Sequence, residues 1–282
     1  MLTTIRTFFT SILLAAALPA APILYTIGAN TNGIPNQLVK IDVANSTVTP
    51  FSTIGNGTQS YGGGLYTSTG VSFMTFQAAG NGQTNFLIMD AFGSPFASAS
   101  LPEFRGGGIA VTTPVQNIVW IQNDAQGVSQ GAINGTILAT LGDNLIGGLA
   151  YRDTNQRLYT IRTDPQGASS FRYIDPNTIS TIALPIAMGT GFTGGLAWDP
   201  TDDLFYAIAS DTNNNATLYR FGLNDAAPTA LFGLGKGFTY ASLTAIPSAA
   251  SVPNTSDTPE PATFLMLGAG LMIIGLTARG RN

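Results

Sequence analysis

The chain contains no cysteine and no histidine. These two absences exclude disulfide bonds, thiolate chemistry, and any catalytic triad or metal site that depends on imidazole. Charged residues are also scarce, at 9% of the chain against roughly 25% in ordinary globular proteins. Only two lysines occur, Lys40 and Lys236, and the formal net charge is −4. Because nucleic acid binding needs clustered basic side chains, we expect no nucleic acid partner.

Glycine, threonine, asparagine and serine take the place of the missing charges. Glycine alone accounts for 33 of the 282 residues, and hydrophobic residues make up 44% of the chain. A chain of this length and content can bury a sizeable core in one large domain or two modest ones. The composition excludes a disordered chain and a charged helical one.

The N-terminus has the pattern of a secretory signal peptide over residues 1–21. Arg6 supplies a short positive region, an apolar stretch follows from Phe8 to Leu18, and small residues stand at Ala17, Ala20 and Ala21. Cleavage can follow any of these three alanines. An N-terminal membrane anchor or a buried strand is the alternative interpretation of the same residues.

The C-terminus combines a rigid motif, an apolar stretch and a basic end. The apolar stretch from Ala262 to Ala278 has 17 residues, which as a helix is about 25 Å long and close to the lower limit for crossing a bilayer. Basic residues then keep the end of the chain on the cytoplasmic side. The rigid motif is the Pro-Glu-Pro unit of Pro259, Glu260 and Pro261, and the predicted membrane stop is Arg279 and Arg281.

This tail, with its sequence PEPATFLMLGAG, resembles the PEP-CTERM sorting signal of bacteria that make extracellular polysaccharide. The resemblance implies a processing partner, the membrane transpeptidase exosortase, which would act near the Pro-Glu-Pro unit. It also implies export across the inner membrane, a membrane-anchored precursor, and a final place in the cell envelope or the extracellular matrix. A plain C-terminal anchor predicts the same topology without cleavage.

Between the two ends the chain repeats itself. Four similar segments begin with glycines, at Gly62, Gly106, Gly147 and Gly194, and a less similar fifth copy begins at Ala241. The apolar residues that follow are separated by 44, 40, 47 and 47 positions: Leu65, Ile109, Leu149, Leu196 and Leu243. A period of about 40 to 50 residues with β character is typical of a propeller.

Each unit reads as four short strands, and the two chain ends complement each other. Residues 23–55 contain the second, third and fourth strands of a unit, whereas residues 241–246 contain only a first strand. We therefore expect an all-β, five-bladed β-propeller that is closed by strands from both chain ends, so that no sheet edge stays open. A β-sandwich and a six-bladed ring are the alternatives.

The predicted organisation has four parts. A signal helix occupies residues 1–21, the propeller residues 22–247, and a Pro/Ser/Thr-rich linker residues 248–258. The sorting signal with its single transmembrane helix occupies residues 259–282.

Several acidic residues invite a functional interpretation. Asp42, Asp90 and Asp175 recur at the ends of third strands, and three carboxylates stand between Asp199 and Asp203. Such oxygens can bind Ca²⁺ or a sugar, but aspartate also caps tight turns. We favour turns in both cases, because Gly222 replaces the aspartate in one unit and the spacing is not that of a dedicated calcium loop. We expect no metal and no cofactor.

Catalysis and ligand binding have few candidate residues. A glycosidase needs a pair of carboxyl groups, yet the only glutamate of the body is Glu103, beside Arg105, which we expect in an inter-blade contact. Aromatic residues in predicted strands are expected in the core rather than stacked on sugars: Trp120, Trp198, Tyr159 and Phe205. Polar loops at residues 77–85 and 209–217 are better candidates for a binding face. The expected function is non-enzymatic binding of extracellular polysaccharide or protein; a secreted glycoside hydrolase acting on matrix polysaccharide is the alternative.

Overall fold

The computed structural model describes thirteen segments of the chain. They are residues 21–30, 36–54, 65–67, 70–78, 83–89, 95–102, 106–112, 117–122, 128–131, 137–140, 148–175, 180–236 and 238–246. All regular secondary structure in these segments is β-strand. The protein body is therefore all-β, as the strand patterns predict.

The strands of the described segments form five antiparallel sheets of four strands each. Three sheets come from consecutive strands in the first half and the middle of the chain: β4 (Leu65–Thr67), β5 (Gly70–Ala78), β6 (Gln83–Met89) and β7 (Pro95–Pro102); β8 (Gly106–Thr112), β9 (Asn117–Gln122), β10 (Val128–Gly131) and β11 (Ile137–Thr140); β12 (Leu149–Arg152), β13 (Arg157–Thr163), β14 (Ser169–Asp175) and β15 (Ser180–Ala183). A fourth comprises β16 (Leu196–Asp199), β17 (Leu204–Ser210), β18 (Asn215–Phe221) and β19 (Thr229–Lys236).

The remaining sheet, called the split sheet here, takes strands from both ends of the chain. Its order is β20 (Phe238–Ile246), β1 (Ile23–Asn30), β2 (Asn36–Asp42) and β3 (Thr47–Ile54). Ile23 pairs with Ile246, so the first strand of the body is hydrogen-bonded to the last. This pairing confirms the predicted complementarity of the two chain ends.

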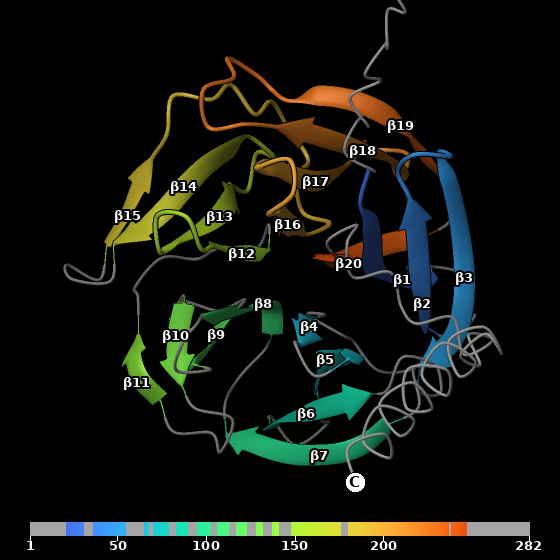
Figure 1. Ribbon diagram of the computed structural model, residues 1–282, viewed down its shortest axis with the longest axis vertical. Helices are drawn as coiled ribbons and strands as arrows, with labels where there is room; N and C mark the ends of the chain where they lie inside the picture. Colours follow the sequence, from blue (N-terminus) through green and yellow to red (C-terminus); the bar gives the residue numbers. More distant parts are fainter. Residues whose placement is uncertain are drawn as a thin grey trace, which may run out of the picture.

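The predicted repeat matches the observed sheets strand by strand. The five apolar residues that mark the repeat lie on β4, β8, β12, β16 and β20. Contacts link β4 with β8, β8 with β12, β12 with β16, β16 with β20, and β20 with β4. Figure 1 shows these strands nearest the centre of the molecule, with β3, β7, β11, β15 and β19 at the periphery.

The glycine pairs of the repeat allow two inner strands to approach closely. Gly148 precedes β12 and has φ 95°, while Gly195 precedes β16 and has φ 115°. Both values lie in the left-handed region that favours glycine. A Cβ atom on Gly148 would overlap the backbone of Gly195 and Leu196. The glycines at these positions therefore let neighbouring sheets meet near the centre.

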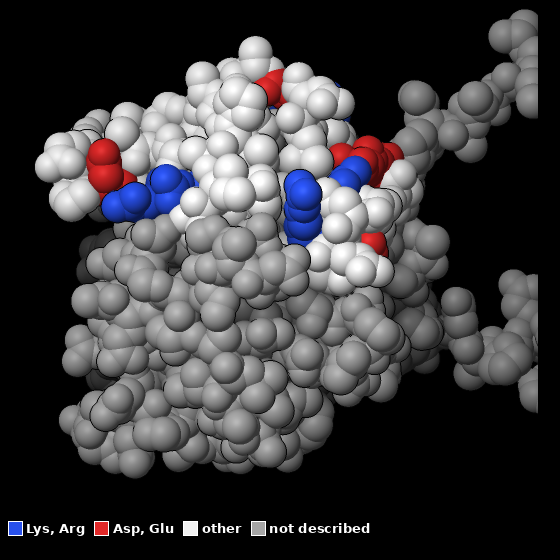
Figure 2. Space-filling model, turned by 90° about the vertical axis from the view of Figure 1, so that its left-hand side faces the viewer, with Lys and Arg blue, Asp and Glu red and all other residues white. Residues whose placement is uncertain are grey.

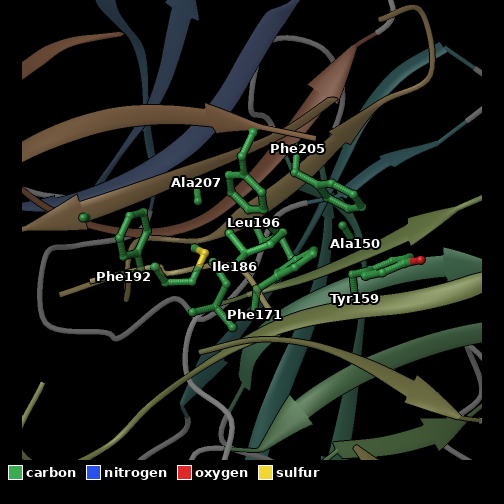
Figure 3. Close-up of a cluster of buried hydrophobic side chains, with 12 residues drawn as sticks. Ala150, Tyr159, Phe171, Ile186, Phe192, Leu196, Phe205 and Ala207 are labelled. Atoms are coloured by element: carbon green, nitrogen blue, oxygen red, sulfur yellow. The ribbon is translucent and has the colours of Figure 1, made fainter. Parts of the chain in front are cut away.

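Aromatic side chains fill the space between the β12–β15 and β16–β19 sheets. Phe171 is fully buried and stacks on Tyr159 with ring centroids 5.4 Å apart. It also meets Phe205 and Phe221 edge-on, each at 5.0 Å. Figure 3 shows this cluster, to which Ile186, Phe192 and Leu196 also contribute. Such edge-on and stacked pairs add to the stability that burial of their area provides.

A second apolar cluster joins the β16–β19 sheet to the split sheet. Its members come from both sheets: Leu24, Val39, Ile41, Ala197, Tyr206, Ile208, Ala216, Leu218, Leu234, Tyr240 and Leu243. Burial raises the pKa of Tyr206 and of Tyr240 to about 12. Residues from both chain ends thus enter one core, which ties the termini of the body together.

Candidate functional site

The sorting motif Pro259, Glu260 and Pro261 and the membrane stop Arg279 and Arg281 lie outside the described residues. So do the predicted transmembrane helix at 262–278, the linker at 248–258, and the predicted signal peptide apart from its last residue. Among the segments that the structure describes, no helix is long and apolar enough to cross a membrane.

Asp42 acts as a turn residue. Its carboxylate accepts hydrogen bonds from the backbone N–H of Asn45 at 3.0 Å and from the Asn45 side chain at 2.9 Å. These bonds lower the pKa of Asp42. Asp42 also ends β2, the third strand of its sheet, away from the inner strands. The turn interpretation is thus confirmed for Asp42, while Asp90 and the side chain of Asp175 lie outside the described residues.

The acidic turn between β16 and β17 buries one of its carboxyl groups. Asp199 has an exposed fraction of 0%, and its Oδ1 accepts a hydrogen bond from the Thr201 N–H at 3.0 Å. Burial raises the pKa of Asp199, and the charge of Asp202 raises it further. The Oδ2 atom of Asp199 and the Oδ1 atom of Asp202 are buried without a hydrogen-bond partner.

Asp203 instead joins two neighbouring sheets. It accepts hydrogen bonds from Arg152 Nε at 2.7 Å and Nη2 at 2.5 Å, and from Trp198 Nε1 at 3.0 Å. The pKa of Asp203 is lowered, chiefly by the hydrogen bond from Arg152. Asp203 has φ 55°, a left-handed conformation that aspartate tolerates better than most residues. Its geometry gives this carboxylate a structural role.

The described residues contain no group of three or more acidic side chains placed to hold a metal ion. Glu103 and Arg105, the predicted inter-blade pair, lie outside them. The acidic turn at 199–203 follows β16 as a hairpin connection, which is the predicted turn role.

The predicted aromatic core residues lie where the pattern places them, as far as their side chains are described. Tyr159 and Phe205 have exposed fractions of 1% and 0%, and their tilted rings lie 4.9 Å apart between centroids within the cluster of Figure 3. Trp198 is half-buried and donates to Asp203. Trp120 lies on β9. Tyr159 and Phe205 are thus inaccessible for stacking on a sugar.

Two polar loops, at 164–168 and 211–214, follow the second strands of their sheets and have the same hydrogen-bond pattern. Asp164 Oδ1 accepts hydrogen bonds from the backbone of Gln166 at 3.0 Å and Ala168 at 2.8 Å. Asp211 Oδ1 accepts in the same way from Asn213 and Asn215, both at 2.8 Å. The polar composition of the second loop marked it as a candidate in the sequence, whereas the first loop was not predicted. The signal that relates them is the aspartate directly after each second strand, Asp164 after β13 and Asp211 after β17.

The described part of the surface is mostly uncharged. In Figure 2, basic side chains (blue) and acidic side chains (red) occur there singly or in small mixed groups. No large basic patch is visible on that part of the surface in this view. This distribution agrees with the charged content of 9%.

Residues 257–282 match the PEP-CTERM protein-sorting motif. The motif implies an exported protein that is sorted by exosortase. It also implies that the C-terminus anchors the protein in the membrane before processing. Among curated proteins, none matches the chain significantly.

Solved structures similar to the chain are propeller-like β proteins. A protein of unknown function from Bacteroides caccae is 11% identical, with a TM-score of 0.54, over 80% of this chain and 99% of that one. TolB from Acinetobacter baumannii is 9% identical, with a TM-score of 0.52, over 82% of this chain and 68% of that one. At such identities the likeness concerns the fold alone.

Proposed function

We propose that the chain is an exported, non-enzymatic β-propeller that exosortase sorts to the cell envelope or matrix, where its body binds extracellular polysaccharide or protein. The sorting motif at residues 257–282 carries the proposal. A sorting signal on a repeat body of polar loops and structural carboxylates fits a binding protein better than an enzyme. The fold alone would not distinguish the two, because propellers serve many functions.

The body is a five-bladed ring in this proposal. Support comes from the pairing of β20 with β1 and from the contacts that run from β4 through β8, β12 and β16 to β20 and back to β4. Pairing with β20 covers the edge of β1, which would otherwise be open to pairing with another chain. Ending the chain after residue 237 removes β20, and we expect the shortened protein to lose cooperative unfolding and to aggregate. A shortened protein that unfolds like the intact one would contradict closure by β20.

Four described carboxylates have structural partners, which supports a non-enzymatic role. Asp42, Asp164 and Asp211 hold turn backbones, and Asp203 binds Arg152. Asp199 has the raised pKa of a candidate acid, but its exposed fraction of 0% leaves a substrate no access to it. A glycosidase needs its carboxyl pair on both sides of a reachable glycosidic bond.

The mass of the protein recovered from its native host tests the sorting part of the proposal. Loss of both terminal segments makes the mature protein lighter than the 29.3 kDa of the full chain. Replacing Pro259, Glu260 and Pro261 by alanine should leave the C-terminal segment attached and the protein in the membrane fraction. Recovery of the full-length chain from the extracellular matrix would contradict both proposed cleavages, that of the signal peptide and that near the sorting motif.

Binding and hydrolysis assays run in parallel test the function of the body. We expect retention on polysaccharide or protein from the extracellular matrix, with no release of reducing ends. Asp199→Asn serves as a check, since it removes the one described carboxyl group with a raised pKa. Bond cleavage by the wild-type protein that disappears in this variant would favour the hydrolase.

A further inference from the structure

Both ends of the body leave it on one face. Ile23 pairs with Ile246, and the Pro22 carbonyl accepts a hydrogen bond from Val43 N–H at 3.4 Å. The start of β1, the end of β20 and the turn between β2 and β3 therefore lie at the same end of the split sheet. This end is called the entry face here, because the segments that lead to the membrane connect to it.

The neighbouring sheets continue the entry face. Only residue 237 separates Lys236, which ends β19, from Phe238, which starts β20, and both lie opposite the entry face. In the β16–β19 sheet, the turns at 200–203 and 222–228 thus belong to the entry face. The ion pair of Arg152 with Asp203 brings the 153–156 turn of the β12–β15 sheet to the same face.

The opposite end of these sheets, called the far face here, carries the two polar loops at 164–168 and 211–214. The connection between β15 and β16 joins them. Gly191 N–H donates to the Gly167 carbonyl at 3.0 Å, and Ser210 N–H donates to the Gly191 carbonyl at 3.0 Å. Gly191 has φ 78°, and a Cβ atom there would overlap the Ser210 carbonyl oxygen. The two loops and this connection thus form one continuous surface.

The two loops of the far face present polar groups on a fixed backbone. Asp164 Oδ1 and Asp211 Oδ1 accept hydrogen bonds from their own loop backbones, and Asp211 Oδ2 accepts from the Asn215 side chain at 2.6 Å. Pro165 and Ala168 are exposed beside these groups. The exposed polar side chains of the two loops are three amides, a hydroxyl and one carboxylate: Gln166, Asn213, Asn214, Thr212 and Asp211. Loops that are held in place in this way lose little conformational entropy when a ligand binds.

The charge of the far face selects among ligands. Neither loop contains a basic residue; the basic residues next to them are Arg162 on β13 and Lys236, which ends β19 and pairs with Asn215. A net charge of −4 disfavours acidic polymers, whereas amides and hydroxyls match the alternating donors and acceptors of sugar hydroxyl groups. We propose that the far face binds an uncharged polysaccharide chain across the loops at 164–168 and 211–214. This inference rests on the proposed binding function and assigns it a surface and a ligand class.

The absence of cysteine provides a direct test. Single variants Asn213→Cys on the far face and Asn224→Cys on the entry face both replace an exposed asparagine. Each full-length variant is purified in a polyoxyethylene detergent, which contains no sugar, and half of each sample is capped with a bulky maleimide. Binding is measured to neutral polymers (dextran, cellulose and xylan oligosaccharides) and to an acidic one (oligogalacturonate). Since capped and uncapped samples share one fold, loss of folding cannot imitate the effect.

We expect capping at residue 213 to weaken binding of a neutral polymer by about tenfold or more, and capping at residue 224 by less than about twofold. Neutral binding that survives capping at 213 would overturn the surface assignment and leave the proposed function standing. Tighter binding of oligogalacturonate than of any neutral polymer would overturn the ligand class. Failure to bind any of the polymers would overturn this inference, while binding to a matrix protein in the same preparation would keep the proposed function.

Discussion

Two aspartates of one five-residue segment, when each is replaced by asparagine, should change the free energy of unfolding in opposite directions. Asp199 is buried with an unpartnered Oδ2 atom, whereas Asp203 binds Arg152 and has an exposed fraction of 49%. Replacing each by asparagine removes the charge and keeps the shape. We expect Asp199→Asn to raise the free energy of unfolding at about pH 7 and Asp203→Asn to lower it.

The Asp199 effect follows from burial. An unsatisfied buried polar group costs about 1–3 kcal/mol, and asparagine removes the charge of a buried carboxylate that is close enough to Asp202 for the charge of Asp202 to raise its pKa. We expect a gain of about 1 kcal/mol. The pKa of Asp199 is raised in the folded state, so its carboxyl group favours folding below the unfolded pKa and this contribution is lost as pH rises through the folded pKa. The gain from asparagine should therefore vanish below about pH 4.

The Asp203 effect follows from pairing. Hydrogen bonds to a charged group contribute about 1.5–3 kcal/mol to the free energy of unfolding when they are buried. Because Asp203 is partly exposed, we expect its replacement by asparagine to lower the free energy of unfolding by about 1 kcal/mol. The pKa of Asp203 is lowered in the folded state, so its contribution is present above the unfolded pKa and is lost as pH falls through the folded pKa. Asparagine also tolerates the left-handed backbone conformation at position 203, so the variant tests the loss of charge without added backbone strain.

Urea unfolding followed by far-UV circular dichroism, repeated over pH, measures both differences on the full-length chain. High salt should shrink the Asp203 effect more than the Asp199 effect, because exposed charges are screened more strongly. If both variants changed stability with the same sign at neutral pH, the assignment of one carboxylate to burial and the other to pairing would be wrong.

Three further predictions concern the core and the inner strands. Phe171→Ala should lower the free energy of unfolding by about 3–5 kcal/mol, whereas Ile182→Ala, at a side chain 39% exposed, should cost far less; chemical denaturation compares them. Gly148→Ala should destabilise the protein more than Gly167→Ala in thermal melts, because both glycines have positive φ but only the first would meet backbone atoms. Equal melting temperatures would refute that reasoning. Tyr206, with a pKa of about 12, should stay protonated in an ultraviolet titration up to about pH 11, and earlier ionisation without unfolding would contradict its burial.

Local pattern was enough to place the strands. Glycine pairs, apolar runs and polar turns recur along the chain, and Leu149 and Leu196 indeed begin β12 and β16. The matching ends of the chain predicted that β20 and β1 share a sheet, and they pair as expected. The Pro-Glu-Pro tail was recognisable by itself, because its motif consists of residues that are close together in the sequence. These features depend on residues that are close together in the chain.

Tertiary structure alone decided which polar residues are buried, paired or exposed. Asp199 and Asp203 look alike in the sequence, yet the packing of neighbouring sheets buries the first and sets the second against Arg152, 51 residues away. Likewise, loops more than 40 residues apart become one surface only because Gly191 lies between them. Burial, pKa and the direction that a loop faces depend on neighbours from other sheets, and no local pattern encodes those neighbours.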